Sequence, residues 1–148
     1  MISNTIDQEI KQAMLAKNQS RLRGLRAIKA ALLLAKTERG HTEEITEEGE
    51  LKILQRLVKQ RKESADIYKQ QGREDLSLIE EEEIEVISDF MPKQLDRSEI
   101  EMIVADLIKS SGASSAKDMG KVMGLANKAL AGKADGKLIS EIVKLQLA

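Results

Sequence analysis

Apolar residues recur at helical spacing along almost the whole chain, and a single proline, Pro92, interrupts that pattern. No segment shows the sustained alternation of apolar and polar residues that is typical of a half-buried strand. Proline lacks a backbone N–H and clashes with the preceding helical turn, so a helix has to end before it. The sequence therefore predicts an all-α protein, with longer helices before Pro92 and shorter helices after it.

Helix-capping residues divide both parts of the chain further. Before Pro92 we expect four helices, which start at Ser3 or Asn4, Ser20, Thr46 and Asp75. After it we expect three, which start at the capping box Asp96–Glu99, at Ser115 with Asp118, and at Asp135. Glycines predict several helix ends, at Gly40, Gly112 and Gly132. The pattern predicts a four-helix N-terminal domain over residues 1–92 and a three-helix C-terminal domain over residues 93–148.

The apolar faces predict which parts of the N-terminal helices are buried. The run from residue 30 to residue 35 is apolar all round, so we expect the C-terminal half of the second helix to be buried on several sides. In the fourth helix we expect Ile79 and Ile87 to point inward. The only two aromatic residues of the chain, Tyr68 and Phe90, fall on inward faces of the third and fourth helices.

Two charged residues also fall within these apolar stripes. Arg61 lies in the stripe of the third helix, and Glu83 lies in that of the fourth. A charge in such a position needs a partner. One hypothesis is that Arg61 pairs with Glu83, or with Glu80, across the helix interface. The alternative is that Arg61 extends its guanidinium into water.

Several kinds of catalytic site are excluded by composition. The chain has no Cys and one His, which rules out disulfides, thiolate nucleophiles and Cys- or His-pair metal sites. His41 is expected in an exposed loop, where a catalytic base would not be held rigidly. The run Glu80–Glu83, with Glu85, is interpreted as a solvated acidic face rather than a metal site. No nucleotide-binding glycine motif is complete. We therefore predict no catalytic residue, no metal and no cofactor.

The charge of the chain is balanced in total and uneven along its length. The net charge is −1, but residues 1–40 carry 8 basic and 3 acidic groups, residues 41–100 carry 9 and 17, and residues 101–148 carry 7 and 5. The longest apolar run has six residues, which is far too short to span a membrane. The start of the sequence lacks a signal-peptide pattern. We expect no membrane partner and a cytoplasmic location.

The C-terminal part carries the candidate binding residues. Lysines near helix starts and glycine-exposed backbone suit phosphate groups, without reading of bases. The RNA-binding candidates are Lys117, Lys121, Lys128, Lys133 and Lys137. Gly120 and Gly124 lie four residues apart in one predicted helix and are interpreted as a face that lets another helix, or a partner, approach closely. Because this part has no aromatic residue, RNA contact has to rely on charge and shape.

The sequence also resembles the YqeY proteins. The resemblance rests on residues 91–95 (MPKQL), 113–124 (ASSAKDMGKVMG), 132–138 (GKADGKL) and 59–64 (KQRKES), and it extends over essentially the whole chain. It implies the same arrangement of four helices followed by three. It also implies a C-terminal part similar to the tail domain of GatB, the amidotransferase subunit that helps to hold tRNA. The resemblance also implies an association with carbon–nitrogen ligases that use glutamine as amido donor. It assigns no catalytic residue to this chain.

Three functional hypotheses follow. The first is a non-catalytic accessory module that binds tRNA or another RNA through the lysines of its C-terminal helices. The second is a helical protein–protein interaction module, docking on an amidotransferase or another translation-related protein without binding nucleic acid. The third is a glutamine-dependent carbon–nitrogen ligase, which rests on the family association alone.

Overall fold

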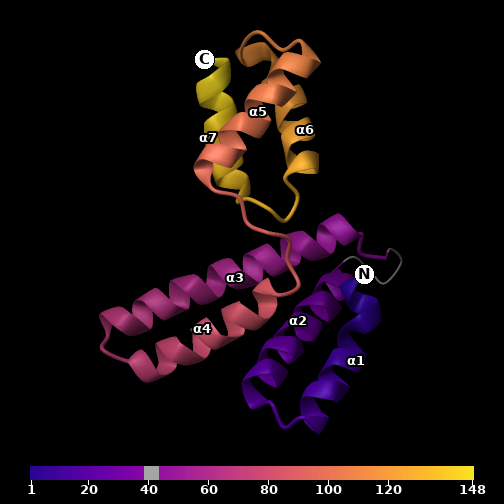
Figure 1. Cartoon of the computed structure of the whole chain (residues 1–148), viewed down its shortest axis with the longest axis vertical. Coiled ribbons are helices and arrows are strands. Elements are labelled where there is room, and N and C mark those ends of the chain that lie inside the picture. Colours follow the sequence, from indigo (N-terminus) through magenta and orange to yellow (C-terminus); the bar gives the residue numbers. More distant parts are fainter. Residues whose placement is uncertain (39–43) are drawn as a thin grey trace. The chain divides into compact units, whose positions relative to one another are not determined.

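The computed structural model describes residues 1–38 and 44–148, and these residues are arranged as helices joined by short connections (Figure 1). The helices are α1 (Ile2–Leu15), α2 (Gln19–Glu38), α3 (Glu47–Gln70), α4 (Glu74–Ser88), α5 (Arg97–Ser111), α6 (Met119–Ala129) and α7 (Gly136–Leu147), with a 3₁₀ turn, η1 (Ala116–Asp118), before α6. No strand occurs in the described residues, so the prediction of an all-helical chain is confirmed. None of the helices described is long and apolar enough to cross a membrane.

The described chain forms two compact units, Met1–Pro92 and Lys93–Ala148. The first contains α1 to α4, in which α2 packs on α1, α3 and α4, and α3 packs along α4. The second contains α5, η1, α6 and α7; the three α-helices contact one another, and η1 contacts α6 and α7. Each unit has its own core, formed around Leu25, Leu54 and Ile87 in the first and around Val104, Val122 and Val143 in the second. The two cores have no residue in common.

The start of α1 differs from the prediction. Neither Ser3 nor Asn4 caps this helix, which begins at Ile2 with no side-chain cap from Met1. Instead, the carboxylate of Glu50 in α3 accepts hydrogen bonds from the N–H groups of Ile2 and Ser3, at 3.0 and 2.9 Å. The cap comes from another helix, so no local capping pattern predicts it.

The connection between α1 and α2 also corrects the prediction. Ser20 does not cap α2; Oδ1 of Asn18 accepts the N–H of Arg21 and the hydroxyl of Ser20, both at 3.2 Å. The turn before it places Lys17 at φ 55°, in the left-handed region. The expected end of α2 at Gly40, like the loop position of His41, lies outside the described residues.

The apolar run near the end of α2 is less buried than predicted. Leu32 is buried, but Leu33 and Leu34 are 55% and 61% exposed. The first unit has only α1, α3 and α4 to cover α2, and these helices pack on the faces that carry Leu22, Leu25, Ile28 and Leu32. One side of α2 is therefore apolar and uncovered within this unit.

The third and fourth helices follow the prediction in part. Thr46 caps α3 by accepting the N–H of Gly49, as predicted. In α4, Ile87 is buried, but Ile79 is 37% exposed, whereas Ser77 and Val86 are buried. Val86 is buried because α4 crosses α2 at Gly24, where the absence of a side chain lets the two helices approach closely.

The capping predictions for the second unit are confirmed. Asp96 and Glu99 form a complete capping box at the start of α5, and Gly112 ends that helix in the left-handed conformation. Ser115 and Asp118 form a second box, which starts η1 and leads into α6. Asp135 caps α7 through the N–H of Lys137. Local side-chain chemistry thus defines all three helix starts here.

Candidate nucleic-acid interface

Helix α6 presents two distinct faces. Val122, Ala126 and Leu130 at its inner face are fully buried against α5 and α7. Because residues three and four apart lie on the same side of a helix, the outer face carries residues 120, 121, 124 and 128, all of which are exposed. Lys117, in η1 directly before α6, is exposed as well. The apolar inner face fixes the orientation of α6, so the lysines among these residues point into solvent.

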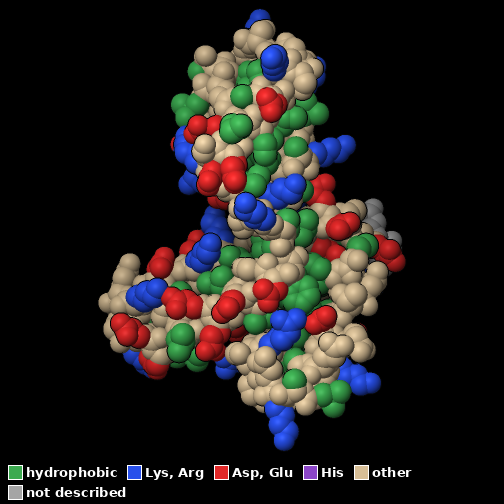
Figure 2. Space-filling model, viewed as in Figure 1, with side chains coloured by type: hydrophobic (Ala, Val, Ile, Leu, Met, Phe, Trp, Pro, Cys, Tyr) green, Lys and Arg blue, Asp and Glu red, His purple; other side chains and the backbone are tan. Residues whose placement is uncertain are grey.

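The outer face contains two of the predicted RNA-binding lysines, Lys121 and Lys128, and a third, Lys117, lies in η1 directly before α6. Lys121 Nζ donates a hydrogen bond to the carbonyl of Ser111, at 3.2 Å, which holds this lysine against the end of α5. In Figure 2, Lys and Arg side chains project from the margin along α6. These three lysines are exposed, and none of them forms an ion pair with a described residue.

Gly120 and Gly124 lie on the same outer face. A Cβ atom built at either glycine meets nothing within 4 Å. The described part of the chain therefore does not pack against these two glycines. The glycines leave the backbone of α6 open beside Lys121, where an external group can approach it.

Lys133 and Lys137 lie beyond the opposite end of α6 from Lys117, in the connection to α7 and in the first turn of α7. This connection is held by the start of the unit. The Leu95 N–H donates to the Lys133 carbonyl at 3.0 Å, and the Gln94 amide donates to the Gly132 carbonyl at 2.6 Å. Two of the predicted lysines, Lys121 and Lys128, thus lie within α6, about 10 Å apart along its axis at 1.5 Å per residue, and the others lie before and after this helix.

The carboxylates of the second unit are mostly engaged elsewhere. Asp96, Glu99, Asp118 and Asp135 take part in helix caps. Arg97 binds the carboxylates of Glu101 and Glu141 at 2.9 and 3.4 Å, and these contacts, with the hydrogen bond to Glu101 first, raise the pKa of its guanidinium. Most of these carboxylates are thus engaged by helix ends or by Arg97. None of them forms an ion pair with a lysine of α6 in the described residues.

The acidic run in α4 is bound to basic residues of the neighbouring helices. Glu82 pairs with Arg23 of α2 at 2.7 Å, and Glu81 pairs with Lys69 of α3 at 2.6 Å. The hydrogen bond from Lys69 to Glu81 raises the pKa of that lysine. No group of metal-ligating side chains occurs in residues 1–38 and 44–148. The run serves to attach α4 to α2 and α3.

The structure brings Arg61 and Glu83 together. Nε of Arg61 donates to Oε2 of Glu83 at 2.8 Å, and the two side chains are 19% and 16% exposed. The pair joins α3 to α4 inside a mostly apolar contact and involves Glu83 rather than Glu80. Both charges are largely removed from water, so each needs the other as its partner. The ion pair therefore favours one alignment of α3 against α4.

Removing one partner of this ion pair is expected to destabilise the first unit. In a double-mutant cycle with Arg61→Met and Glu83→Gln, we expect a coupling free energy of about 1–2 kcal/mol, because each single variant leaves a poorly solvated group unpaired. The exposed pair Arg73–Asp75, joined by hydrogen bonds of 3.1 and 3.2 Å, is the control. Its cycle should give a much smaller coupling, because water screens both charges. Urea unfolding of the variants in both cycles measures the two coupling free energies. Equal coupling in the two cycles would contradict the prediction.

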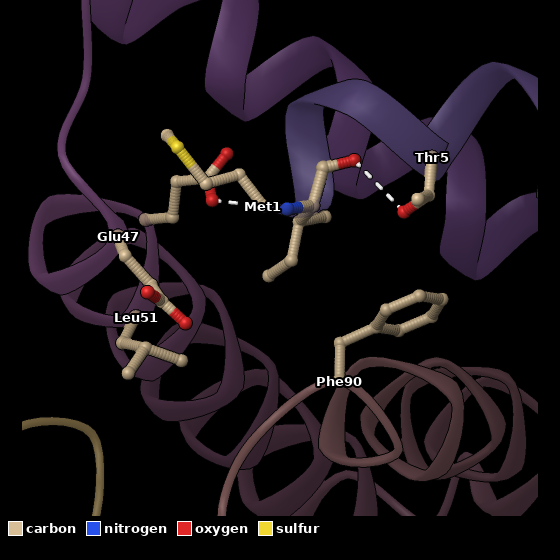
Figure 3. Close-up of a pocket in the computed structure, with 7 residues that line it drawn as sticks. Met1, Thr5, Glu47, Leu51 and Phe90 are labelled. Carbon is tan, nitrogen blue, oxygen red and sulfur yellow. Dashed lines mark hydrogen bonds between the residues drawn. The ribbon is translucent and has the colours of Figure 1, made fainter.

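Sequence reasoning did not single out Glu50. This carboxylate is 1% exposed and lies beside a cavity of about 240 Å³ whose lining includes Met1, Thr5, Leu51 and Phe90 (Figure 3). The signal was present, because Glu50 precedes Leu54 by four residues and so falls in the apolar stripe of α3. The same reasoning that identifies Arg61 identifies Glu50.

Comparison with protein families identifies the family of this chain. A comparison with protein families matches residues 3–147 to the family YqeY, described as Yqey-like protein. A search of curated proteins finds no match. The family match extends over nearly the whole chain and includes both units. The chain therefore belongs to the YqeY family.

Proposed function

We propose that this protein is a non-catalytic RNA-binding module, which contacts the phosphate backbone through the outer face of α6. The observation that carries the proposal is the exposure of Lys121 and Lys128 on this face and of Lys117 directly before it, without ion-pair partners in the described residues. The open backbone at Gly120 and Gly124 supports it, because a phosphate strand can lie close to the helix there. Lys133 and Lys137 extend the positive charge beyond the end of α6.

The proposed contact is with backbone phosphates rather than with bases. Residues 93–148 contain no aromatic side chain, so base stacking is not available to this unit. Lysine binds phosphate as a point charge and does not read base edges bidentately. Because this part resembles the GatB tail, tRNA is the RNA class to test first. Amidotransferases and other translation-related proteins are the candidate protein partners.

We also propose that the two units are separate domains, with residues 1–92 as the first and residues 93–148 as the second. Two cores without shared members support this division. The second unit then carries the RNA contact, and the first unit has a role of its own. This division predicts that a destabilising change in one core leaves the other core intact.

The test of RNA binding is electrophoretic mobility with total tRNA across a salt series. Binding is expected to weaken with a slope of about −0.7 to −0.9 per phosphate neutralised. Lys121→Glu with Lys133→Glu should abolish the shift. Lys59→Glu, which makes half of this charge change on an exposed lysine of α3, should reduce it by much less than half. Absence of any shift at low salt, or an equal loss in the Lys59→Glu control, would contradict the proposal.

A second candidate uses the same face without nucleic acid. The open backbone at Gly120 and Gly124 also fits a partner helix, which would make the protein a helical interaction module. Such a contact tolerates salt and fails when a large side chain covers the glycines. Gly124→Leu should therefore abolish the binding of a protein partner, whereas RNA binding through the flanking lysines should respond to salt and to Lys121→Glu.

A further inference from the structure

A second surface, on α2, carries a repeat of exposed residues that the proposed RNA contact does not use. Arg26, Ala30, Leu34 and Glu38 are spaced four residues apart and are all exposed. Residues at this spacing form one of the ridges by which helices pack on each other. Leu34 is 61% exposed and stands at the centre of this side of α2, with Leu33, 55% exposed, next to it. We call the four residues the α2 ridge.

The charges at the two ends of the α2 ridge have no ion-pair partner in the described residues. Three of the other four cations of α2 do have partners: Arg21 pairs with Glu9, Arg23 with Glu82, and Lys29 with Asp7, whereas Lys36, like Arg26, forms no ion pair with a described residue. Arg26 and Glu38 form no such contact within residues 1–38 and 44–148. Glu38 also stands in the last turn of α2, where the helix dipole disfavours a negative charge. A cation from outside the described chain would compensate it.

The α2 ridge is complementary to itself when reversed. If a second α2 lies antiparallel across the first, with the axis midway between residues 30 and 34, Arg26 faces Glu38 of the second copy and Ala30 faces its Leu34. Two-fold symmetry makes every contact occur twice, which is the property of an isologous interface. The large side chain then packs over the small one, and both end charges gain a partner. The antiparallel arrangement also places the two helix dipoles favourably.

We propose that this face of α2 is the interface of a homodimer, in which the α2 ridges of two copies pack antiparallel. The occupant is a second copy of this chain because one segment supplies both halves of the pattern, in charge and in size. The α2 ridge spans about 18 Å at 1.5 Å per residue. A two-helix contact of this length buries less than the ~1,600 Å² of a standard interface, so the dimer is weak and reversible.

The first test is sedimentation velocity of the full chain at low salt, from about 10 μM to about 1 mM, which is the range for a weak complex. The sedimentation coefficient of the wild type should rise with concentration. Leu34→Glu should remain monomeric throughout, because it places a carboxylate over Ala30 of the second copy. Leu78→Glu, at a leucine of α4 that is 55% exposed, is the matched control and should associate as the wild type does.

The second test uses charge reversal. Arg26→Glu and Glu38→Arg should each weaken self-association about tenfold, because each variant places like charges opposite one another. A mixture of the two variants should associate, since one copy then carries two acidic ends and the other two basic ends. The double variant Arg26→Glu with Glu38→Arg should recover self-association. A misfolded variant cannot produce that recovery.

Three results would overturn the proposal. They are a wild-type chain that stays monomeric at the highest concentration, a Leu34→Glu variant that associates as the wild type does, and a mixture of the two charge variants that fails to associate. The first would leave the α2 ridge without a second copy to cover it. The second would place the association on another surface. The third would show that the end charges do not meet.

Discussion

Gly24→Ala is expected to destabilise the first unit by about 2–3 kcal/mol, although alanine favours a helix over glycine by about 1 kcal/mol. A Cβ at residue 24 would lie 2.6 Å from both Cβ and Cγ1 of Val86. Carbon atoms pack at about 3.5–4.0 Å. Rotation of Val86 moves its Cγ1 but not its Cβ, which is attached to the backbone of α4. Helices α2 and α4 therefore have to separate, and every contact between them weakens.

The matched control is the same substitution at an exposed glycine. Gly124→Ala adds a Cβ that meets nothing within 4 Å, so only the helix preference acts. We expect this variant to be more stable than the wild type by about 1 kcal/mol. Urea unfolding of the two variants checks both signs. If Gly24→Ala were as stable as Gly124→Ala, helices α2 and α4 could separate enough for the added Cβ without loss of unfolding free energy, which would contradict the prediction.

The same pair of variants tests the division into two domains. Hydrogen exchange measured by mass spectrometry reports protection for each segment separately. Gly24→Ala should lower the protection of α1 to α4 and leave that of α5 to α7 unchanged. Gly124→Ala should raise the protection of α5 to α7 alone. Parallel changes in both units would mean that the chain unfolds as one cooperative domain.

Local signals in the sequence predicted those features of the fold that depend on neighbouring residues. The capping boxes at Asp96 and Ser115 and the cap at Thr46 were identified correctly, because each side chain binds an N–H two or three residues away. The helical class followed from the spacing of apolar residues. The α6 lysines and glycines were likewise located on one helix by spacing alone, and the burial of Val122 and Ala126 then gave that helix its orientation.

Except at the start of α2, where Asn18 and not Ser20 accepts the N–H of Arg21, the failures involve another helix. Spacing shows that residues 30–35 of α2 are apolar, but it cannot show that the first unit leaves one side of α2 uncovered. Ile79 fits the apolar stripe of α4, yet the position of α2 at Gly24 turns Val86 inward and leaves Ile79 partly exposed. For the same reason the start of α1 was assigned to Ser3 or Asn4, while its actual cap comes from α3, almost fifty positions away.

Glu50→Ala is expected to destabilise the first unit by about 3 kcal/mol, which makes it one of the largest effects of a single substitution in this protein. Each oxygen of the Glu50 carboxylate accepts one N–H from the start of α1. That helix has no cap of its own and no acidic residue in its first turn, so no other side chain replaces the carboxylate. The negative charge also lies at the positive end of the α1 dipole.

Two further variants separate the hydrogen bonds from the loss of a side chain. Glu50→Gln retains one acceptor oxygen and nearly the same volume, so we expect it to lose less stability than Glu50→Ala. Glu63→Ala removes an exposed carboxylate from the same helix and should change the free energy of unfolding by about 0.5 kcal/mol or less. The three variants share one urea-unfolding assay, and a Glu50→Ala variant as stable as Glu63→Ala would contradict the capping role.

The loss should also begin at α1. Because Glu50 joins α3 to the first two N–H groups of α1, its removal frees the end of a helix that otherwise contacts mainly α2. Hydrogen exchange should therefore rise first in residues 2–15, before the amides of α3 and α4 respond. A uniform increase over all four helices would instead mean that Glu50 supports the core as a whole. The segment in which exchange rises first thus distinguishes a helix cap from a packing residue.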